Sequence, residues 1–230
     1  MRKNNMLTGS PIKTIVFFSL PIMLSSLLQY NYSLVDNIIV GRYVSTDALA
    51  AVGNVGPIGS FLIGAAFGLT SGFTIPVAHA FGAGDKRKLS HYAGNSITIS
   101  AIVGVAIIIV AHLLTRPLLK AIGTPSEIID LSAAYMNILY FGVPFQMLSN
   151  NFTAISRAVG ESKKPLYFFM ISVIVNFVLD LLFVKNFKWG VEGAAWATLI
   201  ANAVAALLTG IYVIKYNKDV EIKKSDLKPN

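Results

Sequence analysis

Two acidic residues stand within long apolar stretches of this sequence. Asp36 lies near the end of the first stretch and Asp180 lies inside the fifth, with Asn176 four residues before it and thus on the same helical face. An ionised side chain at membrane depth costs about 2.5 kcal/mol or more, so it normally faces a partner or a wet cavity and marks an ion, proton or substrate path. These three residues are the first candidates for a functional site.

Their chemistry suits a small cation. Carboxylate, amide carbonyl and hydroxyl oxygens together form a site for a hard cation such as Na⁺, and carboxylates taken out of water also hold protons. Thr198, in the sixth stretch, is a candidate hydroxyl ligand. Two alternatives stay open: Asp36 lies at the membrane interface, or Asp180 makes a structural hydrogen bond between helices.

Further polar residues share faces with these candidates. Gln29 and Tyr32 fall on the helical face of Asp36, and because a polar stripe avoids lipid, this face is expected to look inward. The fourth stretch is also more polar than a structural helix requires, and its side chains are candidates for lining a cavity: Asn137, Tyr140, Gln146, Asn150 and Asn151.

The composition predicts an integral membrane protein. Hydrophobic residues make up 54% of the chain and charged residues 13%, and the mean hydropathy is +0.64. The sequence predicts six transmembrane helices, at roughly residues 12–38, 52–78, 93–116, 128–150, 166–185 and 193–214. We therefore expect an all-α bundle over residues 1–214 and a solvated cytoplasmic tail over residues 215–230.

The net charge of +8 is explained by membrane topology rather than by nucleic-acid binding. If the N-terminus is cytoplasmic, only five of the 19 Lys and Arg residues fall outside: Arg42, Arg116, Lys120, Lys185 and Lys188. This positive-inside bias predicts that both termini face the cytoplasm. No binding motif or interleaved aromatic residues accompany the basic residues, so nucleic acid is not an expected partner.

Local patterns predict several turns and contacts. Gly-rich turns open the basic loops GAGDKRK (82–88) and GESKK (160–164), and Thr124 to Glu127 has the pattern of a capping box that starts the fourth span. Ser60, Gly64, Gly68 and Gly72 recur every four residues, which predicts the close approach of another helix.

Catalytic sites and cofactors are not expected. The chain has no Cys, its three His residues are scattered, and it lacks a nucleotide-binding motif, so the sequence favours a non-enzyme without a cofactor.

Several segments, in order, resemble multidrug and toxic compound extrusion (MATE) transporters. They are LTGSPIK near the N-terminus, VDNIIVGR (35–42), ALAAVGN (48–54), GAGDKRK, ISRAVGESKKP (155–165), NFVLD (176–180) and WGVEGAAWAT (189–198). The match runs through essentially all six predicted spans, and the order of the motifs makes it more specific than any one of them.

The resemblance implies a fold and a function. Family members have twelve transmembrane helices in two six-helix lobes and export cationic, amphiphilic compounds by Na⁺ or H⁺ antiport with alternating access. It implies that Asp36, Asn176, Asp180 and Thr198 hold the coupling cation, that Gln29 lies nearby, and that Pro21 bends the first helix. This chain corresponds to one lobe, so substrate contacts from a second lobe do not carry over.

The sequence therefore predicts one lobe of a cation-coupled efflux transporter of the inner or plasma membrane. The expected partners are amphiphilic small molecules, membrane lipid and a second six-helix lobe, either a missing C-terminal half or a second copy of this chain. Two other functions remain open: a related lipid or oligosaccharide flippase, whose cavity should be continuously basic and lack an acid pair, and a membrane partner lobe that transports nothing.

Overall fold

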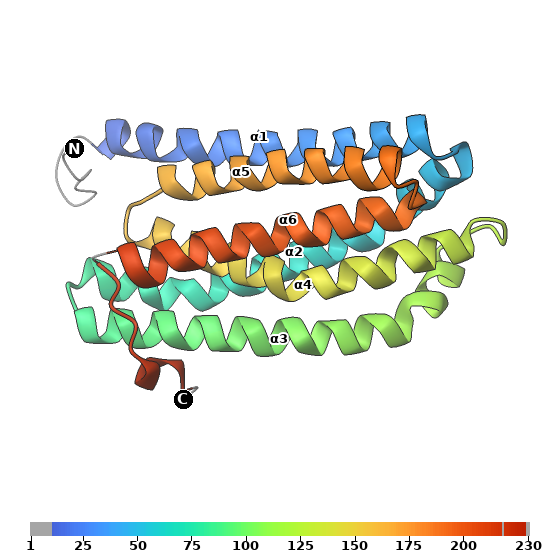
Figure 1. Ribbon diagram of the computed structural model, residues 1–230. Coiled ribbons are helices and arrows are strands. Elements are labelled where there is room, and N and C mark those ends of the chain that lie inside the picture. Colours follow the sequence, from blue (N-terminus) through green and yellow to red (C-terminus); the bar gives the residue numbers. More distant parts are fainter. Residues whose placement is uncertain (1–10, 218, 229–230) are drawn as a thin grey trace.

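The computed structural model describes residues 11–217 and 219–228, which form a bundle of long helices (Figure 1). The long helices are α1 (Pro11–Tyr43), α2 (Thr46–Gly82), α3 (Lys86–Ala121), α4 (Ile129–Ala158), α5 (Lys163–Asp180) and α6 (Gly190–Ile211). α5 and α6 continue as the π-helical segments η1 (Leu181–Asn186) and η2 (Tyr212–Tyr216). The described residues contain no strand, so the predicted all-α fold class is confirmed. Arg2, Lys3 and Lys218, which contribute to the predicted charge bias, lie outside the described residues.

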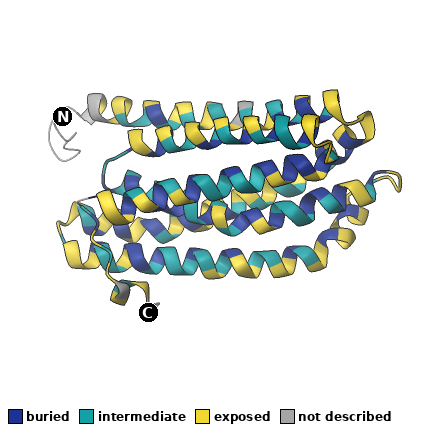
Figure 2. Ribbon diagram, in the orientation of Figure 1, coloured by how far each residue is buried: buried dark blue, intermediate teal, exposed yellow. Residues whose placement is uncertain are grey.

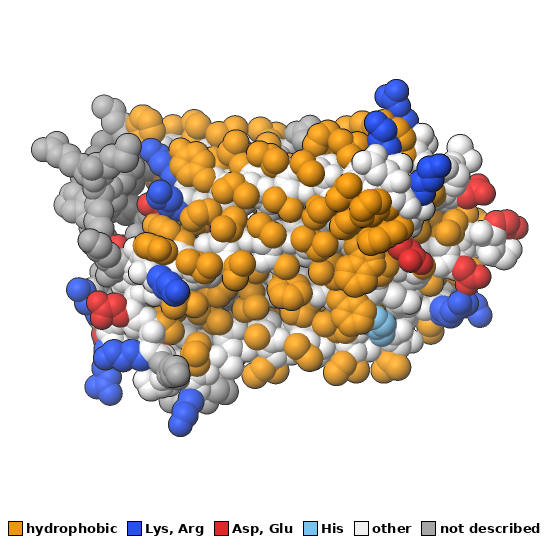
Figure 3. Space-filling view, viewed as in Figure 1, with side chains coloured by type: hydrophobic (Ala, Val, Ile, Leu, Met, Phe, Trp, Pro, Cys, Tyr) orange, Lys and Arg blue, Asp and Glu red, His pale blue; other side chains and the backbone are white. Residues whose placement is uncertain are grey.

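Counted with their π-helical continuations, the helices are longer than the apolar stretches that predict them. α2 has 37 residues, which at about 1.5 Å per residue exceeds a hydrocarbon core of roughly 30 Å. Apolar side chains cover the middle of the bundle, and charged side chains gather toward its two ends (Figure 3). Large apolar side chains are exposed on this surface, for example Phe61 at 74% and Leu113 at 74%. This distribution is the one expected for a protein surrounded by lipid.

α4 differs from the other long helices. Five helical stretches of the described chain are long and apolar enough to cross a membrane, and α4 is not among them. It packs against α2, α3 and α6, and buried residues are frequent along it (Figure 2). Its polar side chains therefore contact protein rather than lipid, so α4 does not need the mean hydropathy of a lipid-facing helix.

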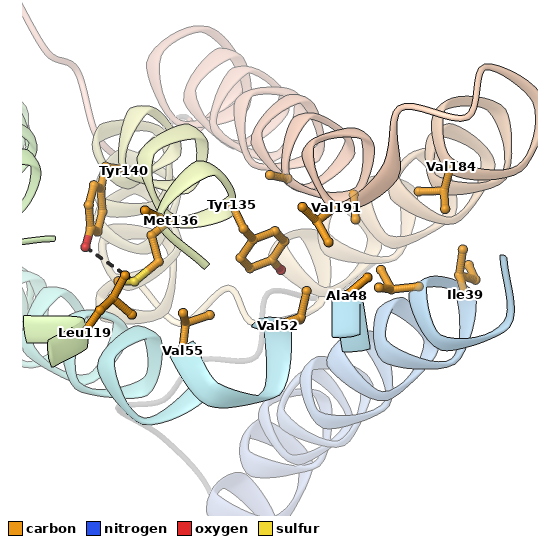
Figure 4. Close-up of a cluster of buried hydrophobic side chains, with 14 of the residues drawn as sticks. Ile39, Ala48, Val52, Val55, Leu119, Tyr135, Met136, Tyr140, Val184 and Val191 are labelled. Atoms are coloured by element: carbon orange, nitrogen blue, oxygen red, sulfur yellow. Dashed lines mark hydrogen bonds between the residues drawn. The ribbon is translucent and has the colours of Figure 1, made fainter. Parts of the chain in front are cut away.

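The remaining helices complete the bundle around α4. α1 lies beside α5, α5 packs against α6, and α3 packs against α4 (Figure 1). One apolar cluster joins α1, α2, α4 and α6 and includes Ile39, Val52, Tyr135 and Val191 (Figure 4). This cluster brings the end of α1 close to α6 although the two helices are far apart in the sequence.

Both Gly-rich loops end a helix as predicted. Gly84 follows α2 with φ +72° and Gly160 follows α4 with φ +83°, a conformation that side chains rarely adopt. Asp85 then caps α3, because its carboxylate accepts a hydrogen bond of 3.0 Å from the Lys88 N–H. That hydrogen bond, together with the Lys88 ammonium at 3.5 Å, lowers the pKa of Asp85 below its ordinary value.

One local prediction is wrong, and a second finds no partner within the described chain. The capping box at Thr124 does not form, because α4 begins at Ile129 without a side-chain cap, and the Thr124 hydroxyl instead accepts a hydrogen bond of 2.6 Å from Asn54. The Thr124 hydroxyl therefore makes a tertiary contact and does not cap α4. The glycine ridge also has no neighbour within the described chain, since a Cβ added at Gly64 or Gly68 would meet nothing within 4 Å.

The tail is also less solvated than predicted. Val220 is 1% exposed and packs against α2, α3 and α4, and the short 3₁₀ helix η3 (Lys224–Leu227) lies against α3. The Thr98 hydroxyl donates a hydrogen bond of 2.7 Å to the Leu227 carbonyl. At Gly94 a side chain would collide with the Asp226 carbonyl, so the absence of a side chain on α3 makes this packing possible.

Candidate cation site

Three helices bring the predicted site residues together. Asp36 comes from α1, Asn176 and Asp180 from α5, and Thr198 from α6. The Thr198 hydroxyl donates a hydrogen bond of 3.4 Å to Asp36 Oδ2, and the carboxyl groups of Asp36 and Asp180 lie close enough to interact. Asp36 is 6% exposed, Asn176 1% and Asp180 0%. Asp36 is therefore buried within the bundle, and its depth in the membrane stays a prediction.

Polar atoms in this site lack partners. Within the described part of the chain, the following buried atoms accept or donate no hydrogen bond: Tyr32 Oη, Asp36 Oδ1, Asn176 Nδ2, Asp180 Oδ1 and Asp180 Oδ2. A buried polar group without a partner costs about 1–3 kcal/mol, and a charged one costs more. Neither Asp180 oxygen has a described hydrogen-bond partner, although its carboxyl group lies within reach of Asp36 on α1, so a structural hydrogen bond between these helices stays an alternative. The oxygens fit a bound cation or proton.

Backbone geometry places Asp180 at a change of helix type. Asp180 is the last residue of α5, and the π-helical segment η1 begins at Leu181. Such segments are rare and often occur at functional sites, because the wider turn changes which side chains face a neighbouring helix. Here Asn176 and Asp180 both lie inside the bundle, while Phe177 and Val178 are exposed at 45% and 54%. The change from α-helix to π-helix therefore occurs immediately after Asp180, the residue whose carboxyl group faces α1.

Two tyrosines border the acidic pair. The Tyr32 hydroxyl lies beside Thr198 and near both carboxyl groups, as expected for its helical face. Tyr135 of α4 is 7% exposed and also lies near Asp36 and Asp180. Tyr135 is not among the residues predicted for the site, because an aromatic residue in an apolar helix looks like an ordinary core residue. Figure 4 shows its ring among the core side chains.

A cavity of about 150 Å³ adjoins the site. Thr198 and Tyr32 line it together with Gln29, Tyr140 and Gln146. The two α4 residues therefore reach a cavity next to the acidic pair, as predicted. Asn150 does not line this cavity and faces a second, larger one instead.

Other polar residues of α4 have structural roles. The Asn151 amide donates a hydrogen bond of 3.1 Å to the Ser100 hydroxyl and accepts one of 3.2 Å from the Ser96 hydroxyl. The Asn137 amide oxygen accepts a hydrogen bond of 3.2 Å from the Thr115 hydroxyl. These bonds join α4 to α3. The polarity of α4 thus has two causes, packing on one face and a cavity on another.

Pro21 lies inside α1, which is continuous from Pro11 to Tyr43. Proline has no N–H to donate, so the helix loses one backbone hydrogen bond at this point. The Pro21 carbonyl accepts a hydrogen bond of 2.9 Å from the Ser25 hydroxyl. A helix with a missing bond bends more easily, so Pro21 stays the predicted hinge.

Comparison with known proteins places this chain in a family. The MatE family model matches residues 21–182. The chain is 31% identical over 217 residues to the probable multidrug resistance protein YoeA of Bacillus subtilis, covering 93% of this chain and 47% of that protein. It is 27% identical to the multidrug export protein MepA of Staphylococcus saprophyticus, covering 96% and 49%. The chain spans about half the length of the curated relatives it matches.

Solved structures show the same relation. A MATE crystal structure in a bent conformation superposes with a TM-score of 0.92 at 30% identity, covering 100% of this chain and 51% of that chain. An outward-facing multidrug resistance MATE transporter superposes with a TM-score of 0.91 at 30% identity, with the same coverage. These proteins are transporters rather than enzymes. The helical bundle, its apolar belt and the match over residues 21–182 together show that this chain is a multi-pass membrane protein of the MATE multidrug efflux transporter family.

Proposed function

We propose that this chain is the cation-coupled lobe of an efflux antiporter. Na⁺ or H⁺ binds between Asp36 and Asp180, with Asn176 and Thr198 as neutral oxygen ligands. Amphiphilic and often cationic compounds leave the cell as the cation enters, through a cycle of alternating access. A cation can shift the equilibrium between the inward-open and outward-open states only if it binds one of them more tightly than the other. The acidic pair must therefore change its geometry during the cycle.

The observation that carries this proposal is the buried acidic pair. Two carboxyl groups from α1 and α5 face each other, and three of their four oxygens have no described partner. Two like charges at this depth repel each other, and a cation or proton between them removes the repulsion. Binding of the cation would therefore draw α1 and α5 together, and its release would let them separate.

The position of the site supports entry of the cation from outside. Asp36 lies near the end of α1 that leads into α2, and Thr198 lies in the first half of α6. The positive-inside bias favours an orientation in which this end of the bundle faces the outside and both termini face the cytoplasm. In this proposal the protein resides in the inner or plasma membrane. Pro21 lies in the other half of α1, where bending would move the cytoplasmic part of the helix.

The substrate path requires more surface than this lobe offers. Since the relatives are about twice as long, a second six-helix lobe would complete the path, either a C-terminal half or another copy of this chain. Chemical crosslinking in a mild detergent tests the second possibility. If crosslinking yields only monomer, the homodimer is contradicted. The proposal of a cation site at Asp36 and Asp180 does not depend on this result.

Na⁺ binding by the purified protein tests the proposal directly. Isothermal titration with NaCl should show binding at pH 8 that weakens at pH 6, because protons and Na⁺ compete for the same carboxylates. Asp36→Asn and Asp180→Asn should abolish it, and in cells they should abolish drug export while leaving expression intact. Asp47→Asn, an exposed residue in the first turn of α2, is the matched control. Unchanged export in both site variants would refute the proposal. In the wild type, export without Na⁺ binding would identify H⁺ as the coupling ion, and the absence of both Na⁺ binding and export would favour a partner lobe that transports nothing.

A further inference from the structure

A second cavity, of about 430 Å³, lies between α1, α2, α4, α5 and α6. Ala78, Ala158 and Pro165 border it, so it extends toward the end of the bundle where α2 joins α3 and α4 joins α5. Its volume falls in the range of roughly 300–1,000 Å³ that is typical of small-molecule sites. Gln29 and Phe169 line both this cavity and the smaller one beside the acidic pair, so the two cavities adjoin.

Arg157 is the only charged residue among the described residues that line the larger cavity. It lies in the last turn of α4, and its Nε is buried without a described hydrogen-bond partner. No carboxylate of the described chain forms an ion pair with it. The side chain is half-buried, and the end of α4 offers only about half a negative charge, so much of the guanidinium charge has no described counter-charge. An Arg in such a position normally pairs with an anion.

Polar side chains extend from Arg157 along the same wall. Ser149 and Thr153 precede it at intervals of four residues, which places all three on one face of α4. Within the described part of the chain, the side chains of Ser149, Asn150 and Thr153 make no hydrogen bond, unlike Asn151, which is bonded to α3. This wall therefore offers donors that are free to bind a ligand.

The facing walls carry large apolar side chains between small polar ones. Ser25, Thr70 and Thr74 also line these walls, but their hydroxyls donate hydrogen bonds to the backbone of their own helices. Phe18 and Ile22 of α1, Phe67 and Ile75 of α2, and Phe169 of α5 line the cavity opposite the polar face. A ligand that satisfies both sides has an anionic group for Arg157 and a hydrocarbon part for these side chains. Phosphate and carboxylate match the planar, forked donors of a guanidinium.

We propose that this cavity binds an anionic amphiphile, with its phosphate or carboxylate group held by Arg157 and by the Ser149 and Thr153 hydroxyls. Only the interpretation of this cavity as a substrate site rests on the proposed transport function. Binding of the amphiphile itself needs no coupling cation. It extends the range of compounds beyond the cationic amphiphiles expected from the family. The adjoining cavities place such a ligand next to Gln29, on the way to the acidic pair.

Isothermal titration of the purified chain in a neutral maltoside detergent tests this proposal in Na⁺-free buffer. Dodecyl phosphate is the probe, and dodecyltrimethylammonium, which has the same alkyl chain and the opposite charge, is the comparison. Arg157→Gln should weaken binding of dodecyl phosphate by about tenfold or more, because a charge-assisted hydrogen bond is lost. Arg157→Lys should restore part of the affinity, and Thr153→Val should reduce it by a smaller factor. Arg116→Gln is the matched control, since Arg116 is exposed and pairs with Asp130 at the opposite end of the bundle.

Two further arms identify the source of the ligand. Inorganic phosphate should bind far more weakly than dodecyl phosphate, because it leaves the apolar wall empty. Displacement of dodecyl phosphate by phosphatidylglycerol but not by phosphatidylcholine would identify a lipid head group as the natural ligand, whereas no displacement by either lipid would identify a soluble amphiphile. Equal affinity of wild type and Arg157→Gln, or an equal loss for dodecyltrimethylammonium, would overturn the proposal. Because no Na⁺ is present and no transport is measured, failure here leaves the acidic site untested, and failure at the acidic site leaves this result intact.

Discussion

Asp180→Asn should stabilise the protein when no coupling cation is present. Asp180 is 0% exposed, and neither of its carboxylate oxygens has a described hydrogen-bond partner. Asparagine has nearly the same shape, removes one of two neighbouring negative charges, and can donate an N–H to Asp36 Oδ1, which also lacks a partner. The variant therefore relieves a cost that the wild type bears in order to bind its cation.

The expected size follows from these unpaired atoms. Each buried polar atom without a partner costs about 1–3 kcal/mol, so two such oxygens cost about 2–6 kcal/mol, of which we expect Asn to recover about 2 kcal/mol. For a chain of this length, about 2 kcal/mol corresponds to an increase in Tm of about 4–8 °C. Na⁺ at about 100 times its Kd should stabilise the wild type by about 2.7 kcal/mol and the variant hardly at all. Na⁺ should therefore reverse the order of the two Tm values.

Thermal unfolding followed by the fluorescence of Trp189 and Trp196 measures both effects. The melts are recorded at alkaline pH, first in choline chloride and then with NaCl at equal ionic strength. Asp130→Asn is the control, because Asp130 is 77% exposed and its pair with Arg116 should contribute little. A lower Tm for Asp180→Asn than for the wild type in choline chloride would refute the reasoning, and so would an equal rise of both values with Na⁺.

Three further results are expected. Thr198→Val should weaken Na⁺ binding about fivefold, equivalent to about 1 kcal/mol, because the hydroxyl that bonds Asp36 at 3.4 Å is lost; unchanged affinity in titration would show that Thr198 is not a ligand. Asp85→Ala should lower Tm at pH 7, because the carboxylate that caps α3 is lost. Since the pKa of Asp85 is lowered in the folded protein, the difference in Tm should shrink as the pH falls below about 3.9 and disappear once it passes the pKa of the folded state. A difference that grows in acid would contradict the capping role. Gly104→Val should cost about 1–3 kcal/mol, because its Cβ would lie 2.8 Å from the Pro144 Cα, and an unchanged Tm would show that α3 and α4 can move apart.

The long helices and the candidate site were predictable to different degrees. Each predicted apolar stretch overlaps one helix, because the transfer of some 20 residues into hydrocarbon depends on their composition and little on their neighbours. The ends were less predictable, since helices continue past the apolar core until a glycine or a cap stops them. At Thr124 the local pattern failed because Asn54, 70 residues away, takes the capping hydroxyl.

Contacts with α4 and with the tail were hidden in the sequence. Tyr135 and Arg157 look like a core aromatic residue and a loop cation, and only the packing of α4 among its neighbours places one beside the acidic pair and the other on a cavity wall. Val220 likewise looked solvated, because a single apolar residue has no periodic pattern.

The sequence by itself determined that this protein lies in a membrane, which stretches form its long helices, and which polar residues are too costly to be accidental. All three depend on the local balance of apolar and charged side chains. The tertiary structure decided which of those polar residues meet. Asp36 and Thr198 are 162 residues apart, and their contact arises only because α1, α5 and α6 pack together and leave the oxygens of Asp36 and Asp180 without partners. Helix packing in lipid depends on shape and on hydrogen bonds between distant residues, so no local pattern encodes it.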